Sequence, residues 1–196
     1  MSATPQPQAL PGPADDTPVL QFDPALLLRA QGVRAAIFDV DGVLTDGGLL
    51  IGEHGESLKR FNILDGQGLK LLQAAGITPL VVTGRDSAPL RLRLASLGIT
   101  QARFGVENKL PAAQELLDAM HLRWEAVAAI GDDWPDLPLL ARAGFAAAPP
   151  NAHAEVRARV AWITPSRGGE GAAREFCDLL LVASGRYADL LRHSLG

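Results

Sequence analysis

The stretch AAIFDVDGVLTDGG, residues 35–48, limits the possible folds of this chain more than any other segment. Its apolar start is typical of a buried parallel strand, and it ends with two aspartates, Asp39 and Asp41, in a glycine-containing loop. Residues i and i+2 of an extended segment face the same side, so the two carboxyl groups converge. Because neighbouring like charges raise each other's pKa, this pair requires a divalent cation or one protonated partner.

A calcium-binding EF-hand loop also starts with two spaced aspartates, but it does not fit here. That loop needs a further oxygen ligand where this chain has Val43, and its glycine comes later than Gly42. The apolar run before Asp39 also favours a strand over the helix that precedes an EF-hand loop. The EF-hand interpretation therefore fails.

The composition excludes several function classes. The chain has 196 residues, 47% apolar and 20% charged, which is enough for one domain with its own core. A formal charge of −4 gives no basis for nucleic-acid binding, and no apolar run reaches the roughly 20 residues that span a bilayer. The single cysteine, Cys177, suits a reducing, cytoplasmic compartment, and we expect it to be a small buried helix residue.

The N-terminal segment differs from the rest of the chain. Its first 24 residues contain six of the 14 prolines and neither lysine nor arginine. A secretory signal needs a basic start followed by an apolar core, and both features are missing. We predict a flexible proline-rich arm over residues 1–22 and a single domain over residues 23–196.

Short β-rich runs alternate with longer helical runs after residue 22. This order predicts an α/β fold, a parallel sheet with helices on both faces and ligands at the carboxyl ends of its strands. The expected strands are residues 35–40, 79–83, 102–105, 126–131, 145–147 and 160–163. The expected helices are residues 68–76, 87–98, 108–122, 136–144 and 151–160.

Segment 87–98 fits two secondary structures. Its leucines alternate with arginines, a period typical of a strand. Asp86 as an N-cap, Pro89 in the first turn and Gly98 as a stop favour a helix instead. We predict a helix.

A second departure from the alternation is LLIGEHGESLKRF, residues 49–61. Two extended arms flank Glu53, His54 and Gly55, which predicts a β-hairpin with a short loop. The segment directly follows the aspartate loop, so we expect it to project near the same strand ends. It is then either a plain surface hairpin or a contact to substrate or to a neighbouring subunit.

Two further strands end in residues that suit phosphate binding and metal binding. PLVVTGR places a hydroxyl, free backbone amides and a guanidinium at Thr83, Gly84 and Arg85. AAIGDDWPD ends a strand with three carboxylates, which are unfavourable together without a cation. These are Asp132, Asp133 and Asp136.

Lys109, in ENKL, is one of only three lysines against 15 arginines. A compact ammonium suits a site that needs a point charge. Each residue alone also has an ordinary interpretation, since Thr83 or Asp136 can cap a helix and a lysine is usually solvated. In this order at strand ends, they predict a phosphoryl-transfer site with a divalent metal.

The motifs DVDGVLTDG, VVTGR, Lys109 and GDDWPD match in order and spacing the four motifs of the haloacid dehalogenase (HAD) superfamily of phosphatases. Adding FNILDGQGLKLL, GVENK and GGEGAAREFCDLLL, the chain resembles the 3-deoxy-D-manno-octulosonate 8-phosphate (KDO 8-phosphate) phosphatases over about residues 33–183. The resemblance implies a Rossmann-like HAD fold with a β-hairpin in place of a cap domain. It also implies Mg²⁺-dependent hydrolysis in lipopolysaccharide precursor synthesis.

The resemblance also implies roles for individual residues. Asp39 would be the nucleophile that forms an aspartyl-phosphate, and Asp41 the general acid and base. Thr83 and Lys109 would hold the phosphoryl oxygens. Mg²⁺ would be bound by Asp39, the backbone carbonyl of Asp41, and Asp132, and Asp133 and Asp136 would orient waters or Lys109.

The family resembled is tetrameric, with the hairpin of one subunit and the tail of another completing a pocket for a phosphorylated sugar acid. The carboxylate of that substrate needs cations. The candidates are Arg85 first, with Gly84 beside it, then Lys59 and Arg60, and last Arg174. Each of these cations also has an ordinary interpretation as surface charge.

Other functions remain to be weighed. The tail reads GGEGA with Glu170, where octulosonate phosphatases usually have arginine. That residue resembles phosphatases of nine-carbon acids, whereas Arg85 and the LDGQG loop favour the eight-carbon acid. A non-catalytic oligomerisation domain is a third possibility, against which the intact motif residues argue. A receiver domain is excluded because its acidic pair precedes its phosphorylated aspartate.

Overall fold

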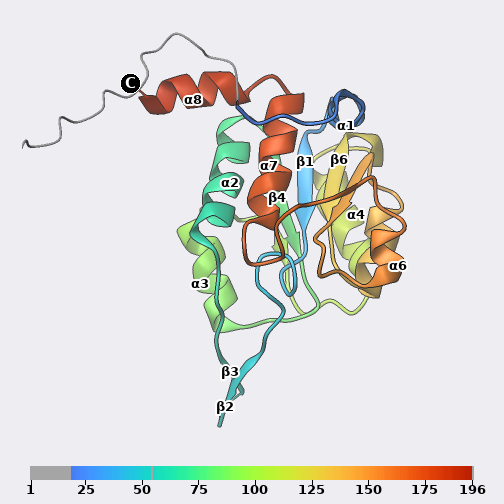
Figure 1. Cartoon of the computed structure of the whole chain (residues 1–196). Helices are drawn as coiled ribbons and strands as arrows, with labels where there is room; N and C mark the ends of the chain where they lie inside the picture. Colours follow the sequence, from blue (N-terminus) through green and yellow to red (C-terminus); the bar gives the residue numbers. More distant parts are fainter. Residues whose placement is uncertain (1–18, 54, 196) are drawn as a thin grey trace, which may run out of the picture.

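The computed structural model describes residues 19–53 and 55–195, so most of the predicted arm over residues 1–22 lies outside the described residues. A six-stranded parallel sheet forms the centre of the fold, with helices on both sides (Figure 1). In sheet order the strands are β5 (Ala102–Arg103), β4 (Thr78–Val82), β1 (Ala35–Phe38), β6 (Val127–Ile130), β7 (Phe145–Ala148) and β8 (Trp162–Ile163). All six predicted strands are confirmed.

The alternation of side chains along β1 divides the core into two halves. Ala36 and Phe38 belong to the apolar cluster on one face of the sheet, and Ala35 and Ile37 belong to the cluster on the other face. β1 pairs with β4 on one side and β6 on the other, and all four of its residues are buried. A central strand therefore brings its carboxyl end, where Asp39 follows, into the middle of the sheet.

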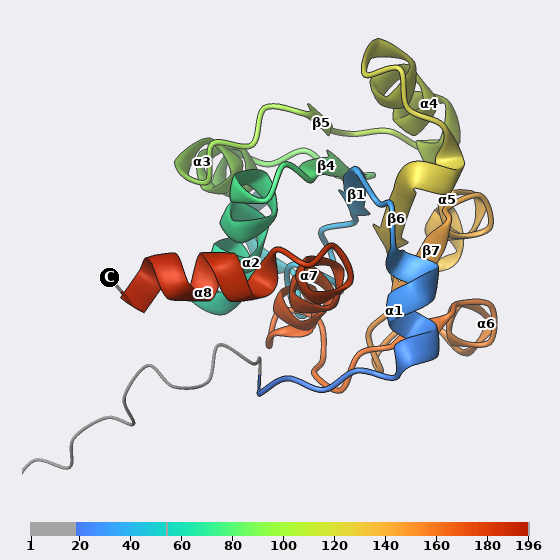
Figure 2. The same cartoon turned by 90° about the horizontal axis from the view of Figure 1, so that it is seen from above.

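Helices cover both faces of the sheet. Seen from above, α2, α3 and α7 lie on one face and α4, α5 and α6 on the other, as predicted (Figure 2). None of the described helices is long and apolar enough to cross a membrane. The helices are α1 (Pro24–Ala30), α2 (Ile63–Ala74), α3 (Ala88–Ser96), α4 (Lys109–Ala119), α5 (Leu137–Leu140), α6 (Ala154–Arg157), α7 (Ala172–Ala183) and α8 (Tyr187–Leu195), with 3₁₀ turns at Trp124–Ala126 and Trp134–Asp136.

The ambiguous segment 87–98 is helical, as predicted, but its start was assigned to the wrong residue. Ser87 occupies the N-cap position of α3, and its side chain makes no capping bond. The carboxylate of Asp86 instead accepts two hydrogen bonds of 2.7 Å from Arg91. Because this bidentate pair uses both oxygens, Asp86 does not cap the helix.

Helix α2 starts five residues before the predicted start, at Ile63, where Asn62 caps it by accepting a 2.8 Å bond from Leu64 N. Gly66 and Gly68 concealed this start because glycine is a poor helix former. At Gly68 a Cβ would lie 3.1 Å from Cys177 Sγ. The glycine therefore lets α2 pack closely on α7, and Cys177 is buried there as predicted.

Two helices were not anticipated from the sequence. Helix α1 is capped by Asp23, whose carboxylate accepts a 2.8 Å bond from Ala25 N. Helix α8 carries no buried residue. Both lie near the amino end of the sheet, away from the hairpin (Figure 1).

The predicted β-hairpin is confirmed. Strands β2 (Leu50–Gly52) and β3 (Gly55–Leu58) pair antiparallel and extend away from the body of the molecule (Figure 1). Leu50, Ile51 and Leu58 are 51%, 63% and 63% exposed. Because these apolar side chains lie in solvent, their burial does not stabilise the hairpin.

The aromatic centre of one core half gives the first prediction. Phe176 is fully buried, and its ring centroid lies 5.5 Å from that of Phe38 and 6.3 Å from that of Phe145. We expect Phe176→Ala to lower the free energy of unfolding by about 3–5 kcal/mol, measured by urea denaturation, because it leaves a cavity. Leu92→Ala, on the exposed side of α3, is the control and should change it by about 0.5 kcal/mol or less. Equal effects would contradict this account of the core.

Candidate active site

The polar segments after β1, β4 and β6 and the start of α4 converge at the carboxyl edge of the sheet. They surround an open cavity of about 340 Å³. The predicted site residues after these strands thus lie together at the carboxyl ends, where parallel sheets commonly bind ligands. The cavity is lined by Asp39, Asp41, Thr83, Gly84, Arg85, Val106, Glu107, Lys109, Asp132, Asp133, Pro135 and Asp136.

Lys109 is the positive centre of this cavity. Its side chain is 5% exposed, and its Nζ lies 2.6 Å from Asp39 Oδ1 and 2.7 Å from Asp136 Oδ1. Burial alone would lower the pKa of Lys109, but the charges of Asp39 and Asp136 outweigh burial and raise it. Lys109 therefore remains an ammonium and holds both carboxylates in place.

Asp136 orients the acidic turn that follows β6. Its second oxygen accepts bonds from the backbone amides of Asp132 at 3.1 Å and Asp133 at 3.3 Å. A Cβ on Gly131 would lie 2.5 Å from Asp136 Cβ, so only glycine permits this approach. With both oxygens already occupied by protein donors, Asp136 is suited to orient neighbouring groups.

The same end of the sheet fits a divalent cation. Asp39, Asp132 and Asp136 each offer an oxygen within 4.8 Å of the others. Burial, followed by the charge of Asp136, raises the pKa of Asp39 to about 7. Burial, followed by the charges of Asp39 and Asp136, raises the pKa of Asp132 to about 8. Three carboxylates face one ammonium, so two positive charges would restore neutrality with oxygen ligands that Mg²⁺ prefers.

The loop that carries Asp39 and Asp41 is held by the C-terminal part of the chain. Gly42 has φ +89°, and a Cβ there would lie 2.0 Å from Asp132 Oδ2. Asn151 Nδ2 donates a 3.0 Å bond to Gly42 O, and Asn151 Oδ1 accepts a 2.7 Å bond from Gly168 N. The sequence analysis missed this role of Asn151, and no motif signalled it because the contact joins residues 109 positions apart.

Asp41 lies in a ring of alternating charges. Lys59 Nζ donates to Asp41 Oδ1 and lies 2.6 Å from Glu56 Oε1. Arg85 closes the ring, with Nε 3.9 Å from Asp41 Oδ2 and Nη2 3.4 Å from Glu56 Oε2. Burial would raise the pKa of Glu56, but Lys59 and Arg85 outweigh it and lower that pKa. Glu56 was not identified from the sequence, although its spacing of three from Lys59 could have suggested the pair.

The remaining predicted residues divide into two groups. Thr83 is buried at the cavity, where its Oγ1 accepts a 3.3 Å bond from Arg85 N, and Gly84 and Asp133 line the cavity. Neither Lys59 nor Arg60 is among the lining residues.

The cations outside the cavity have acidic partners of their own. Arg60 Nη2 lies 3.1 Å from Asp46 Oδ2 and 3.7 Å from Glu170 Oε1, in an exposed position. Arg174 Nε donates a 2.9 Å hydrogen bond to Asp178 Oδ1 within helix α7. The structure therefore brings Arg85, and not these two, to the cavity.

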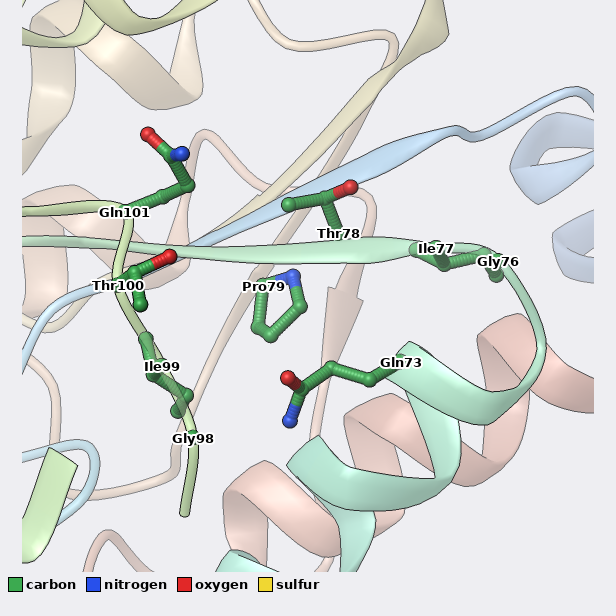
Figure 3. Close-up of a pocket in the computed structure, with 9 residues that line it drawn as sticks. All are labelled: Gln73, Gly76, Ile77, Thr78, Pro79, Gly98, Ile99, Thr100 and Gln101. Carbon is green, nitrogen blue, oxygen red and sulfur yellow. The ribbon is translucent and has the colours of Figure 1, made fainter. Parts of the chain in front are cut away.

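A second cavity, of about 190 Å³, lies at the opposite end of β4 (Figure 3). Gln73, Thr78, Thr100 and Gln101 supply its polar side chains, and none of its lining residues is ionisable. The amide of Gln73 already donates to Leu69 O and Leu97 O. This cavity offers no nucleophile, base or metal ligand, so catalytic chemistry is assigned to the carboxyl edge of the sheet.

Comparisons with known proteins agree with this geometry. A family profile for haloacid dehalogenase-like hydrolases matches residues 105–176. The chain is 40% identical over 170 residues to the 3-deoxy-D-manno-octulosonate 8-phosphate phosphatase KdsC of Escherichia coli K12, covering 87% of this chain and 90% of that protein.

Solved structures show the same similarity. A crystal structure of a probable YrbI-family phosphatase from Pseudomonas syringae has 46% identity and a TM-score of 0.85, covering 87% of this chain and 97% of that one. A 3-deoxy-D-manno-octulosonate 8-phosphate phosphatase from Moraxella catarrhalis, crystallised with magnesium ion, phosphate ion and KDO, has 35% identity and a TM-score of 0.83. That match covers 88% of this chain and 98% of the other.

The raised carboxyl pKa values predict how the metal acts on stability. The folded, metal-free protein keeps protons on Asp39 and Asp132 that the unfolded chain, with values near 3.8, has released. Its stability therefore falls as the pH rises from about 4 to 8. Mg²⁺ competes with these protons, so we expect it to raise Tm more at about pH 9 than at about pH 6.

Thermal unfolding with and without MgCl₂ at both pH values measures this difference. Asp132→Asn, which removes one carboxylate, is expected to abolish most of the Mg²⁺-dependent rise in Tm. A rise of equal size at both pH values would contradict a site that must lose protons to bind metal.

Proposed function

Because the chain belongs to the 3-deoxy-D-manno-octulosonate 8-phosphate phosphatase family of haloacid dehalogenase-like hydrolases, we propose that it hydrolyses KDO 8-phosphate to KDO and phosphate in lipopolysaccharide precursor synthesis. The family recognised from the sequence motifs is thereby confirmed. The observation that carries the proposal is the convergence of Asp39, Asp132 and Asp136, two of which contact the ammonium of Lys109. Together with a divalent cation, this set of charges suits a phosphoryl group.

Asp39 supplies the nucleophile. Its carboxylate attacks phosphorus, the bond to the sugar oxygen breaks, and an aspartyl-phosphate forms. Lys109 at 2.6 Å holds one oxygen of Asp39, which leaves the other oxygen to attack. Fixing a nucleophile in this way removes much of the entropic cost of the encounter.

Asp41 supplies the proton transfers. It protonates the departing sugar oxygen, whose release as an alkoxide would be slow, and then accepts a proton from the water that cleaves the aspartyl-phosphate. This water attacks phosphorus, so phosphate leaves and Asp39 is regenerated. The distance of two residues from Asp39 places Asp41 at the same cavity.

Thr83 and Lys109 hold the phosphoryl oxygens, with the backbone of Gly84 beside them. Asp39, Asp132 and the backbone carbonyl of Asp41 would hold Mg²⁺, and Asp133 and Asp136 would orient them. The cation supplies Lewis-acid stabilisation of the negative charge that accumulates on the phosphoryl group. The protein groups position this charge and exclude competing acceptors.

Arg85 is the group best placed to bind the carboxylate of the sugar acid. It lines the cavity, and its side chain is 44% exposed, so donors remain for a substrate. A guanidinium matches a carboxylate with two parallel hydrogen bonds. One observation favours the nine-carbon acid instead: Glu170 takes a position where the family usually has arginine, and it lies 3.7 Å from Arg60.

The hairpin supports a homotetramer. Leu50, Ile51 and Leu58 in the hairpin are each more than half exposed within this chain. Contiguous exposed apolar side chains of this kind mark interaction sites. A tetramer in which the hairpins pack on neighbouring subunits would bury these three side chains.

We also propose that residues 23–196 form a single domain and that the enzyme is cytoplasmic.

A substrate panel tests the proposed function. We expect Mg²⁺-dependent release of phosphate from KDO 8-phosphate with kcat/KM about tenfold or more above that for the nine-carbon 2-keto acid 9-phosphate. The reason is that Arg85 adjoins the proposed phosphoryl site, and the shorter substrate has its carboxylate closer to its phosphate. Preference for the nine-carbon acid would support the alternative substrate. No turnover of any sugar phosphate would indicate a non-catalytic oligomerisation domain.

Asp39→Asn tests the nucleophile. The amide cannot accept a phosphoryl group, so we expect turnover to fall by about 10⁴-fold or more while Tm stays close to that of the native protein. Phosphate release under saturating Mg²⁺ and circular dichroism measure the two effects. A variant that keeps a tenth of native activity would exclude Asp39 as the nucleophile.

A further inference from the structure

Four side chains, including that of Asp41, form a closed ring that no sequence motif describes. Asp41 and Glu56 alternate with Lys59 and Arg85, so each acid contacts both bases. Glu56 belongs to β3 and Lys59 follows it directly, so half of the ring comes from the hairpin. The ring therefore connects the hairpin to the residue that handles protons in the proposed reaction.

Lys59 occupies an unusual position for a lysine. Its side chain is 1% exposed and that of Glu56 is 8% exposed, whereas Asp41 is 21% exposed. Lys59 and Glu56 do not line the catalytic cavity, although Asp41 and Arg85 do. Lys59 thus contacts Asp41 with a buried side chain that does not line the cavity.

Burying an ammonium and a carboxylate costs free energy that only close pairing offsets. Lys59 is paired with Asp41 Oδ1 and with Glu56 Oε1, and Arg85 lies against the other oxygens of both acids. One oxygen of Asp41 is therefore hydrogen-bonded by Lys59, and the other lies 3.9 Å from Arg85 Nε. A free aspartate rotates about two side-chain bonds, whereas the bond from Lys59 restricts this rotation in Asp41.

We propose that Lys59 is a positioning residue that orients Asp41 toward the leaving-group oxygen, and that Glu56 holds Lys59 for this task. The inference rests on the proposed function, since it assigns Asp41 the proton transfers. The proposal assigns different roles to two of the cations predicted for the substrate carboxylate. Lys59 orients Asp41, and Arg85 faces the substrate. The pose of the hairpin then determines where the general acid points.

The test compares native protein, Lys59→Met, Glu56→Gln and Asp41→Asn with three substrates at saturating Mg²⁺. KDO 8-phosphate has a carboxylate and an alkyl leaving group. Glycerol 3-phosphate has the alkyl leaving group without a carboxylate, and 4-nitrophenyl phosphate has a leaving group that needs no proton. Methionine retains the length of the lysine side chain and removes its charge. Lys70→Met, on the exposed side of α2, is the matched control.

For Lys59→Met we expect kcat/KM, which reports the steps up to formation of the aspartyl-phosphate, to fall about tenfold or more on both alkyl phosphates and about twofold or less on 4-nitrophenyl phosphate. Asp41→Asn should show the same selectivity with a larger loss, and Glu56→Gln a smaller one. Lys70→Met should match the native protein on all three substrates.

Two results would overturn the proposal. A loss confined to KDO 8-phosphate, with a raised KM, would assign Lys59 to the substrate carboxylate. An equal loss of kcat/KM on all three substrates would mean that Lys59 only supports the fold, and Glu56→Gln, which removes a charge without opening a cavity, checks this if Lys59→Met fails to fold. Each ratio is taken within one substrate, so the result stands even if native protein prefers a sugar phosphate other than KDO 8-phosphate.

Discussion

The ammonium of Lys109, held between Asp39 and Asp136, is the interaction on which the rest of the site depends. Three carboxylates at the end of one sheet repel one another, and burial strengthens that repulsion because water no longer screens it. Lys109 reduces the charge without removing it, at 2.6 and 2.7 Å from its two partners. The charge that remains, visible in the raised pKa values of Asp39 and Asp132, is what attracts a divalent cation.

The fold keeps these groups together by close backbone contacts instead of bulky packing. Gly42, Gly131 and Gly168 each sit where a Cβ would lie within 2.5 Å of a neighbouring atom. Gly168 approaches Gly42 O, and Asn151 bonds to both residues, so the C-terminal loop fixes the aspartate loop from outside. The two core halves on either side of β1 hold the strand ends in place, and with them the proposed nucleophile and metal ligands, whose positions catalysis would require to be accurate.

The hairpin carries both exposed apolar side chains and part of the charged ring around Asp41, two features that the sheet alone does not connect. Leu50, Ile51 and Leu58 are exposed along its two strands, and Glu56 and Lys59 on the returning side contact or approach Asp41 as part of the charged ring. In the proposed tetramer, subunit assembly and the proposed proton transfer would therefore share one structural element.

The sequence by itself determined the order of strands and helices and the family, because buried parallel strands and their motif residues are local in the chain and leave a clear pattern. It also determined which residues end those strands, Asp39, Thr83 and Asp132 among them. Only the tertiary structure decided that Lys59 meets Asp41 and not the cavity, that Asn151 bonds Gly42, and that α2 begins at Ile63. Such contacts depend on the packing of segments distant along the chain, and local spacing contains no record of that packing.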